Sequence, residues 1–337
     1  MDTQKLDQTY IANTYARFPV TIVKGKGSLV WDDTGKEYID LSTGIAVDIF
    51  GVADEEWMAA VTKQLGTLQH ISNLYYTEPC VKLAQMLCEK TGMKKVFFGN
   101  SGAEANECAI KAARKWSEEK KGKDYSTIIT LKNSFHGRTI TTLAATGQDV
   151  FHHDFTPLTE GFVYAEPNDL ADLEQLIKAN KCAAVMMEVV QGEGGVMPLD
   201  EAYVKGAAKL CEQYDLLLIC DEVQVGNGRS GKLYGYMHYG VQPDIVSTAK
   251  GLAGGLPLGA TLLGEKVQNV LSAGTHGSTF GGNPVVCAGA LTILDRIDDK
   301  LLADVKAKSA YLFEAFTGAP GIKAVTGMGL MIGLQTE

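Results

Sequence analysis

Between residues 80 and 265, short apolar segments alternate with longer amphipathic ones, and this alternation constrains the fold more than any other feature of the sequence. The short segments have strand length and are rich in β-branched residues, whereas the longer ones have the period of helices. Strands separated by helices of about 10 to 18 residues are typical of βαβ units, because parallel neighbours need a long crossover connection. The sequence therefore predicts an α/β fold with a mainly parallel sheet.

The same patterns place the individual elements. We predict strands at residues 95–98, 127–131, 182–190, 216–220, 245–247 and 259–263, and helices at 103–120, 170–179 and 201–214. Residues up to about 50 are expected to form an arm with small strands, followed by a helix through Trp57 and Val61. Helical periodicity returns after Pro284, and residues 327–334 are expected to begin a strand of a second, smaller domain.

Composition and charge exclude several classes of protein. The 337 residues carry 31 basic and 40 acidic side chains, a formal net charge of −9, which disfavours nucleic acid and anionic membranes as partners. No apolar run reaches the roughly 18 to 20 residues of a membrane span, and residues 1–8 lack the apolar core of a signal peptide. Seven cysteines without a C-x-x-C pair argue against disulfides and a zinc site. We therefore expect a cytoplasmic protein that has no metal and acts on small molecules.

A run of small residues, Gly99-Asn100-Ser101-Gly102-Ala103, joins a predicted strand to a predicted helix. Such a run exposes backbone N–H groups at a helix N-terminus, where the helix dipole favours an anion such as phosphate. The alternative is an ordinary tight turn in which a serine or asparagine caps the helix. The run taken alone leaves both interpretations open.

An acidic pair, Asp221 and Glu222, follows the predicted strand 216–220. Ligands of open α/β sheets bind at the carboxyl ends of strands, although such a pair can also cap a helix or form a surface salt bridge. The sequence contains no G-x-x-x-x-G-K-[ST], which argues against a P-loop NTPase. Its G-x-G-x-x-G, at 226–231, is not followed by a helical pattern, which argues against a dehydrogenase.

Two further features follow predicted strands. Lys250 comes after strand 245–247 and enters a glycine-rich loop. Most lysines are solvated, but one that lies against apolar walls has a depressed pKa and becomes a nucleophile. Phe135 and Arg138, after strand 127–131, offer an aromatic face and a cation, although an aromatic residue at a strand end is usually part of the core.

Taken together, these features match the parts that hold pyridoxal phosphate. A lysine forms the Schiff base, and a carboxylate keeps the pyridine nitrogen protonated so that the ring accepts electrons. An aromatic side chain stacks on the ring, and a helix N-terminus binds the phosphate. The combination predicts a pyridoxal 5′-phosphate enzyme.

The sequence also closely resembles the class III pyridoxal-phosphate aminotransferases, in particular their acetylornithine type, from about Tyr15 to its last residue. The resemblance rests on six blocks in the family's order: Ser-Gly-Ala-Glu-Ala-Asn (101–106), Phe-His-Gly-Arg-Thr (135–139), Gln-Gly-Glu-Gly-Gly (191–195), Asp-Glu-Val-Gln (221–224), Ala-Lys-Gly (249–251) and Ser-Thr-Phe-Gly-Gly-Asn-Pro (278–284). It implies fold type I, with a mainly parallel seven-stranded sheet flanked by helices and a smaller α+β domain.

The resemblance also implies roles for individual residues. Lys250 would form the Schiff base and move the proton between Cα and C4′, while Asp221 would pair with the pyridinium nitrogen. The other implied cofactor ligands are Ser101, Gly102 and Ala103 for the phosphate, Phe135 and Val223 for the two ring faces, and Gln224 for the phenolic oxygen. Thr279 would reach the phosphate of the neighbouring subunit, which implies a homodimer. The implied substrate-binding residues are Arg138 for a carboxylate, Glu193 as the family's switch residue, and Tyr15.

The type of substrate is indicated by fewer residues than the family is. His136, where ornithine aminotransferases carry tryptophan, and the stretch Ser72-Asn73-Leu74-Tyr75-Tyr76 at the lip of the pocket resemble the acetylornithine type. The implied reaction moves the δ-amino group of N-acetyl-L-ornithine to 2-oxoglutarate, giving a semialdehyde and glutamate in arginine biosynthesis. The alternatives are class III ω-aminotransferases acting on succinyl-diaminopimelate, ornithine or 4-aminobutyrate, or a non-enzymatic protein on the same scaffold.

The domain organisation follows from the same resemblance. We expect an N-terminal arm and part of the small domain at 1–55, the large cofactor-binding domain at 56–275, and a connecting helix and incomplete small domain at 276–337. The family's pattern continues past Glu337 and there includes a second carboxylate-binding arginine. Without that segment we expect an uncovered apolar face and weak activity or aggregation.

Overall fold

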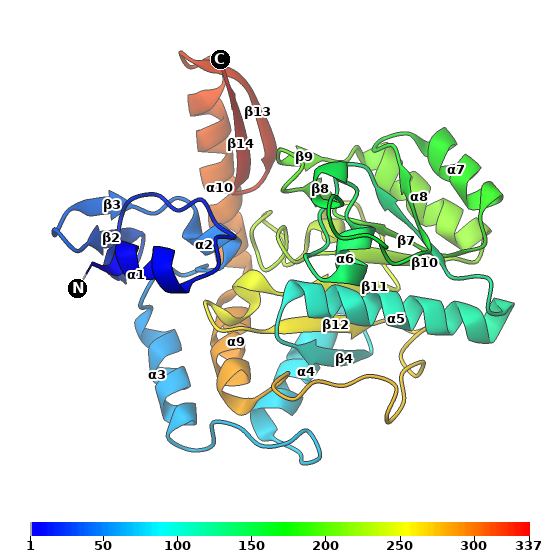
Figure 1. The fold of residues 1–337 in the computed structure, drawn as a ribbon, viewed down its shortest axis with the longest axis horizontal. Helices are drawn as coiled ribbons and strands as arrows, with labels where there is room; N and C mark the ends of the chain where they lie inside the picture. Colours follow the sequence, from blue (N-terminus) through cyan, green and yellow to red (C-terminus); the bar gives the residue numbers. More distant parts are fainter. Residues whose placement is uncertain (1) are drawn as a thin grey trace.

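The computed structural model describes residues 2–337 and is built around a seven-stranded sheet, in the order β4-β12-β11-β10-β7-β5-β6 (Figure 1). Its strands are β4 (Lys95–Gly99), β5 (Thr127–Leu131), β6 (Phe162–Ala165), β7 (Cys182–Met187), β10 (Leu217–Asp221), β11 (Ile245–Thr248) and β12 (Gly259–Leu263). β12 pairs antiparallel with both β11 and β4, and the other pairs are parallel. Six of these seven strands therefore run in one direction, which confirms the predicted mainly parallel sheet.

Helices cover both faces of the sheet, so its central strands are buried on both sides. In β10, Leu218 and Cys220 pack into one hydrophobic cluster, and Leu217 and Ile219 pack into the other. One face is covered by α5 (Gly102–Lys121), which lies across β12 and β11. The opposite cluster includes residues of α4 (Glu78–Thr91), α7 (Leu170–Ala179), α8 (Glu201–Gln213) and α9 (Pro284–Arg296). Apolar side chains on both faces are what a parallel sheet requires.

The connection between β11 and β12 positions the site. It comprises residues 249–258 and includes the short helix η3 (Lys250–Ala253). A connection this short cannot cross over the sheet, so β12 returns antiparallel beside β11. Lys250 is thereby held at the carboxyl edge of the parallel strands, where Asp221 ends β10.

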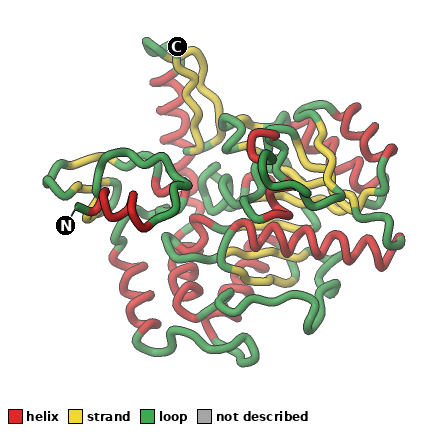
Figure 2. The backbone as a smooth tube through the Cα atoms, in the orientation of Figure 1, coloured by secondary structure: helices red, strands yellow, loops and turns green. Residues whose placement is uncertain are grey.

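Smaller elements surround this core (Figure 2). The N-terminal part contains α1 (Thr3–Tyr10), the antiparallel strands β1 (Ile22–Lys26), β2 (Leu29–Asp32) and β3 (Glu37–Ile39), and the helices α2 (Thr43–Ala46) and α3 (Glu55–Leu65). The C-terminal part contains α10 (Asp299–Phe316), β13 (Ile322–Met328) and β14 (Met331–Thr336). Within the sheet domain lie α6 (Ile140–Ala145), η1 (Asp149–Phe151), β8 (Val190–Gln191), β9 (Met197–Pro198) and η2 (Gly235–His238). In the described part of the chain, no helix combines the length and apolar character needed to cross a membrane.

Among the differences from the sequence predictions, three concern strands. The predicted strand 182–190 ends at Met187, and the side chain of Glu188, which follows it, accepts the Phe135 N–H at 2.7 Å. Residues 327–334 do not begin one strand but include the turn of the β13–β14 hairpin, where Gly329 adopts a φ of +62°. The patterns also miss β6, an edge strand in which only Ala165 is fully buried.

Candidate active site

A cavity of about 250 Å³ opens at the carboxyl edge of the sheet. It is lined by Gly102, Ala103, Asn106, Phe135, His136, Gly137, Arg138, Glu188, Asp221, Val223, Gln224 and Lys250. These residues come from the start of α5 and from the segments that follow β5, β7, β10 and β11. The structure therefore brings together in one cavity eight of the site residues that the sequence predicts.

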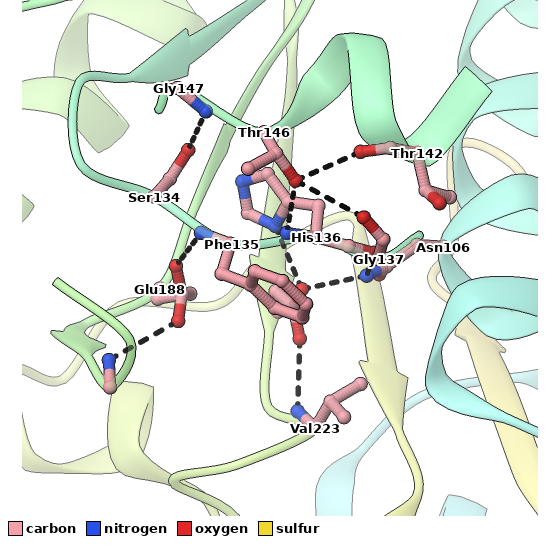
Figure 3. A network of polar contacts seen from close by, with 12 residues as sticks. Asn106, Ser134, Phe135, His136, Gly137, Thr142, Thr146, Gly147, Glu188 and Val223 are labelled. Carbon is pink, nitrogen blue, oxygen red and sulfur yellow. Dashed lines mark hydrogen bonds and ion pairs between the residues drawn. The ribbon is translucent and has the colours of Figure 1, made fainter. Parts of the chain in front are cut away.

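Asp221 lies at the centre of a network of polar contacts, whose donors Asn106, His136 and Val223 are labelled in Figure 3. Its Oδ2 accepts hydrogen bonds from Asn106 Nδ2 at 2.7 Å and from His136 Nδ1 at 2.8 Å. Its Oδ1 accepts the Val223 N–H at 3.0 Å. The Asn106 amide also donates to the His136 carbonyl, which joins α5 to the loop after β5. These donors fix the orientation of the Asp221 carboxylate.

His136 is buried beside this carboxylate. Burial lowers the pKa of its imidazole, but the hydrogen bond to Asp221 and the charges of Asp221 and Glu188 outweigh burial, so the pKa lies above its ordinary value. The His136 backbone N–H donates to Thr146 Oγ1 at 2.9 Å. The ring and its backbone are thus both held in place.

Lys250 is half-buried at the start of η3 and has a φ of +45°. A non-glycine residue in this left-handed region stores roughly 1 to 2 kcal/mol of strain, which tertiary contacts must offset. Burial lowers the pKa of its amine, while the charges of Asp221, Glu193 and Glu188 act in the opposite direction. A larger share of the amine is therefore neutral and nucleophilic than in a solvated lysine.

The N-terminus of α5 forms one wall of the cavity. Ser101 caps this helix, and its Oγ accepts the Glu104 N–H at 3.2 Å. A Cβ at Gly102 would lie 2.6 Å from Val223 Cγ1, so only glycine fits this position. The first backbone N–H groups of a helix lack acceptors within it, so this wall can bind an anion.

Glu188 is buried at the end of β7 and also lines the cavity. Its Oε1 accepts the Phe135 N–H at 2.7 Å, and its Oε2 lies 3.4 Å from the Gly192 N–H. Burial raises the pKa of this carboxyl to about 7, assisted by the charge of Asp221 and opposed by His136 and the two N–H groups. Glu188 can therefore gain or lose a proton near neutral pH.

Four predicted residues do not line the cavity. The Ser101 hydroxyl is used as a helix cap, and Glu193 lies exposed in the turn between β8 and β9, where its charge still acts on Lys250. Thr279 lines a separate hollow beside His276, and Tyr15 lines another near the N-terminus. Their predicted roles remain predictions.

Sequence reasoning did not assign site roles to Asn106, His136 and Glu188. Asn106 and His136 are 115 and 85 positions from Asp221, so their hydrogen bonds exist only in the folded chain. Glu188 follows an apolar run whose pattern conceals it. A carboxylate that follows a buried strand, which is the position that drew attention to Asp221, could have identified it too.

The comparisons with known proteins agree on one family. The model of the class-III aminotransferases matches residues 10–337. Acetylornithine aminotransferase of Haemophilus ducreyi is 51% identical over 334 residues, covering 99% of this chain and 85% of the relative. Succinylornithine transaminase of Yersinia pseudotuberculosis is 44% identical, covering 98% of this chain and 82% of the relative. The solved structure of ornithine aminotransferase from Toxoplasma gondii is 35% identical, with a TM-score of 0.95, covering 99% of this chain and 81% of that one.

Proposed function

The chain belongs to the class III aminotransferases, and from that premise we propose that it moves the δ-amino group of N-acetyl-L-ornithine to 2-oxoglutarate, a step of arginine biosynthesis. Its cofactor is pyridoxal 5′-phosphate, as in other members of the class. The observation that carries the proposal is that Lys250 and Asp221 share one cavity, close to the ends of the neighbouring strands β11 and β10. The higher identity to acetylornithine aminotransferase than to succinylornithine transaminase supports the acetyl substrate.

The residues of the cavity fit this cofactor. Asp221 presents a buried carboxylate suited to a protonated ring nitrogen, and Lys250 presents an amine suited to an aldehyde carbon. At Gly102 no side chain fits, so the helix N-terminus stays open to a phosphate. Phe135 adds an aromatic face to the same cavity.

When bound, the cofactor supplies a carbonyl carbon that exchanges amino groups and a ring that withdraws electrons from the reacting bond. In the resting enzyme, Lys250 Nζ would hold the cofactor through that carbon. Once free, the neutral Lys250 amine would act as the base that moves a proton at the reacting carbon of the substrate. Its lowered pKa suits both roles, because each needs the neutral amine.

Asp221 would hold the ring nitrogen of the cofactor in its protonated form, which would strengthen the electron withdrawal. Asn106, His136 and the Val223 N–H orient the carboxylate for this contact. Arg138 binds the substrate carboxylate that lies far from the reacting carbon. Both N-acetylornithine and 2-oxoglutarate carry such a carboxylate, so Arg138 can bind this group of either substrate.

We further propose that the functional unit is a homodimer. Leu74, Tyr76 and Phe280 are exposed to 88%, 99% and 60%, and large apolar side chains this exposed mark an interaction surface. Asn73 Nδ2 donates to the Ser278 and Gly281 carbonyls, at 2.9 and 3.1 Å, and so joins two parts of this surface. A second copy of the chain that covered this surface would also bury the loop that carries Thr279. This is the residue predicted to reach the phosphate of the neighbouring subunit.

The cysteines support a cytoplasmic location. All seven are free thiols, and five of them are buried. Free thiols persist in a reducing compartment, whereas an oxidising one tends to pair them.

The function is tested by measuring glutamate formation from 2-oxoglutarate with N-acetylornithine, N-succinylornithine, ornithine and 4-aminobutyrate as amino donors. We expect the highest kcat/KM with N-acetylornithine and no turnover by Lys250→Ala. A higher kcat/KM with any other donor would refute the proposed substrate, and turnover by Lys250→Ala would refute the proposed mechanism.

A further inference from the structure

The guanidinium of Arg138 lies over the ring of Phe151, a residue to which sequence reasoning gives no role. Its Cζ lies 4.1 Å from the centroid of the Phe151 ring and 5.4 Å from that of Phe135. The two rings meet edge to face, with their centroids 5.9 Å apart. Phe151 therefore contacts both the cation that would bind a substrate carboxylate and the aromatic ring that lines the cofactor cavity.

Stacking fixes the plane of a guanidinium but leaves its N–H groups free, because these point outward in that plane. The arginine ion pairs within residues 2–337 are formed by Arg17 and Arg296, and none of them involves Arg138. The fork of Arg138 is thus oriented by an aromatic face and remains available for a bidentate carboxylate.

The segment that carries Phe151 is anchored on both sides. Before it, Gln148 Nε2 donates to the Ser134 carbonyl at 3.0 Å, and the Phe151 N–H donates to the Gln148 carbonyl at 3.1 Å. After it, His152 Nε2 lies 3.0 Å and 2.7 Å from the Leu143 and Thr146 carbonyls. The half-buried Phe151 ring is therefore a fixed support for Arg138.

We propose that Phe151 is a positioning residue that sets the distance between the carboxylate-binding fork of Arg138 and the cofactor ring, and thereby selects substrates by chain length. The inference rests on the proposed function, in which Arg138 binds the distant carboxylate. Phe151 does not line the cavity and acts through Arg138. Without the ring, the fork samples other orientations, and carboxylates of different reach become more alike in affinity.

The test measures the binding of glutarate and succinate, non-reacting dicarboxylates that differ by one methylene, to the cofactor-loaded enzyme by calorimetry. In Phe151→Leu we expect glutarate to bind about tenfold more weakly, with a smaller preference over succinate. Phe151→Tyr, which keeps the ring, should retain the wild-type affinity. With N-acetylornithine, the KM of Phe151→Leu should rise while kcat stays close to that of the wild type.

Two controls separate positioning from damage to the fold. Phe155→Leu, at an exposed phenylalanine nearby in the sequence, should leave glutarate binding unchanged. In an Arg138→Ala background, Phe151→Leu should weaken glutarate binding by less than about twofold, because the residue acts through the missing guanidinium. An equal loss in both backgrounds, or an unchanged affinity in Phe151→Leu, would overturn the proposal.

The binding data also separate this inference from the proposed function. If the wild-type enzyme prefers another amino donor, the proposed substrate is refuted. The glutarate measurements still test the positioning role of Phe151. If N-acetylornithine is the best donor but glutarate affinity is the same in Phe151→Leu and Phe151→Tyr, the positioning role fails while the function stands.

Discussion

The buried carboxyl of Glu188 should make the free energy of unfolding depend on pH. The substitution Glu188→Gln should abolish this contribution. Burial raises the pKa of this carboxyl from the ordinary 4.5 to about 7, so the folded protein holds a proton that the unfolded chain releases at lower pH. A raised pKa in the folded state stabilises the fold most at low pH. That contribution falls as the pH rises from about 4.5 to 7 and is lost above it.

The size of the effect follows from the shift. A shift from the ordinary 4.5 to about 7 corresponds to roughly 3 kcal/mol, most of which falls between pH 5 and pH 8. Glutamine has a similar shape and its side-chain oxygen can still accept the Phe135 N–H, but it does not titrate. The variant therefore lacks this part of the pH dependence.

The assay is urea unfolding of the cofactor-free protein at several pH values from 5 to 8, for the wild type, Glu188→Gln and the control Glu314→Gln on the exposed face of α10. We expect the free energy of unfolding of the wild type, relative to Glu188→Gln, to decrease by about 2 to 3 kcal/mol over this range. The control should follow the wild type. A difference between wild type and Glu188→Gln that is constant with pH would refute the reasoning.

Other substitutions have equally direct consequences. Gly102→Ala places a Cβ 2.6 Å from Val223 Cγ1 at the anion-binding wall, and we expect at least about tenfold weaker cofactor binding by fluorescence titration, with wild-type affinity as the contrary result. Asn106→Leu removes the donor that lies 2.7 Å from Asp221 and should lower the free energy of unfolding by about 1 to 3 kcal/mol; an unchanged value in urea titrations would contradict the role of this network. Tyr76→Glu places a charge on the proposed dimer surface, and sedimentation velocity should then find monomers where the wild type is dimeric.

The sequence predicts the fold well wherever the signal is local. The strand at 127–131 and the helix at 170–179 coincide with β5 and α7, because apolar periodicity and turn residues define both ends. The positions of Lys250 and Asp221 also follow from local patterns, since each comes at or after the end of a buried strand. Parallel topology then brings these strand ends to one edge of the sheet.

The rest of the site depends on contacts between distant parts of the chain. The bond from Asn106 to Asp221 spans 115 positions and leaves no periodic trace in the sequence. Glu188 has apolar residues on both sides in the sequence, so the pattern predicts one continuous strand through it. In the structure, β7 ends before Glu188 and β8 begins after it, and Glu188 lines the cavity. Phe151 is a single aromatic residue at the end of the short helix η1. Only its contact with Arg138 in the folded chain indicates a role for it.

The most direct test of the central claim is to locate the cofactor bond. The purified protein, loaded with pyridoxal 5′-phosphate, is reduced with borohydride, digested and mapped by mass spectrometry. We predict one added pyridoxyl phosphate group on the peptide that contains Lys250, no such group in Lys250→Ala, and protection of the wild type from trapping when N-acetylornithine is added first. Attachment to another lysine, or trapping that persists in Lys250→Ala, would contradict the assignment of the active site.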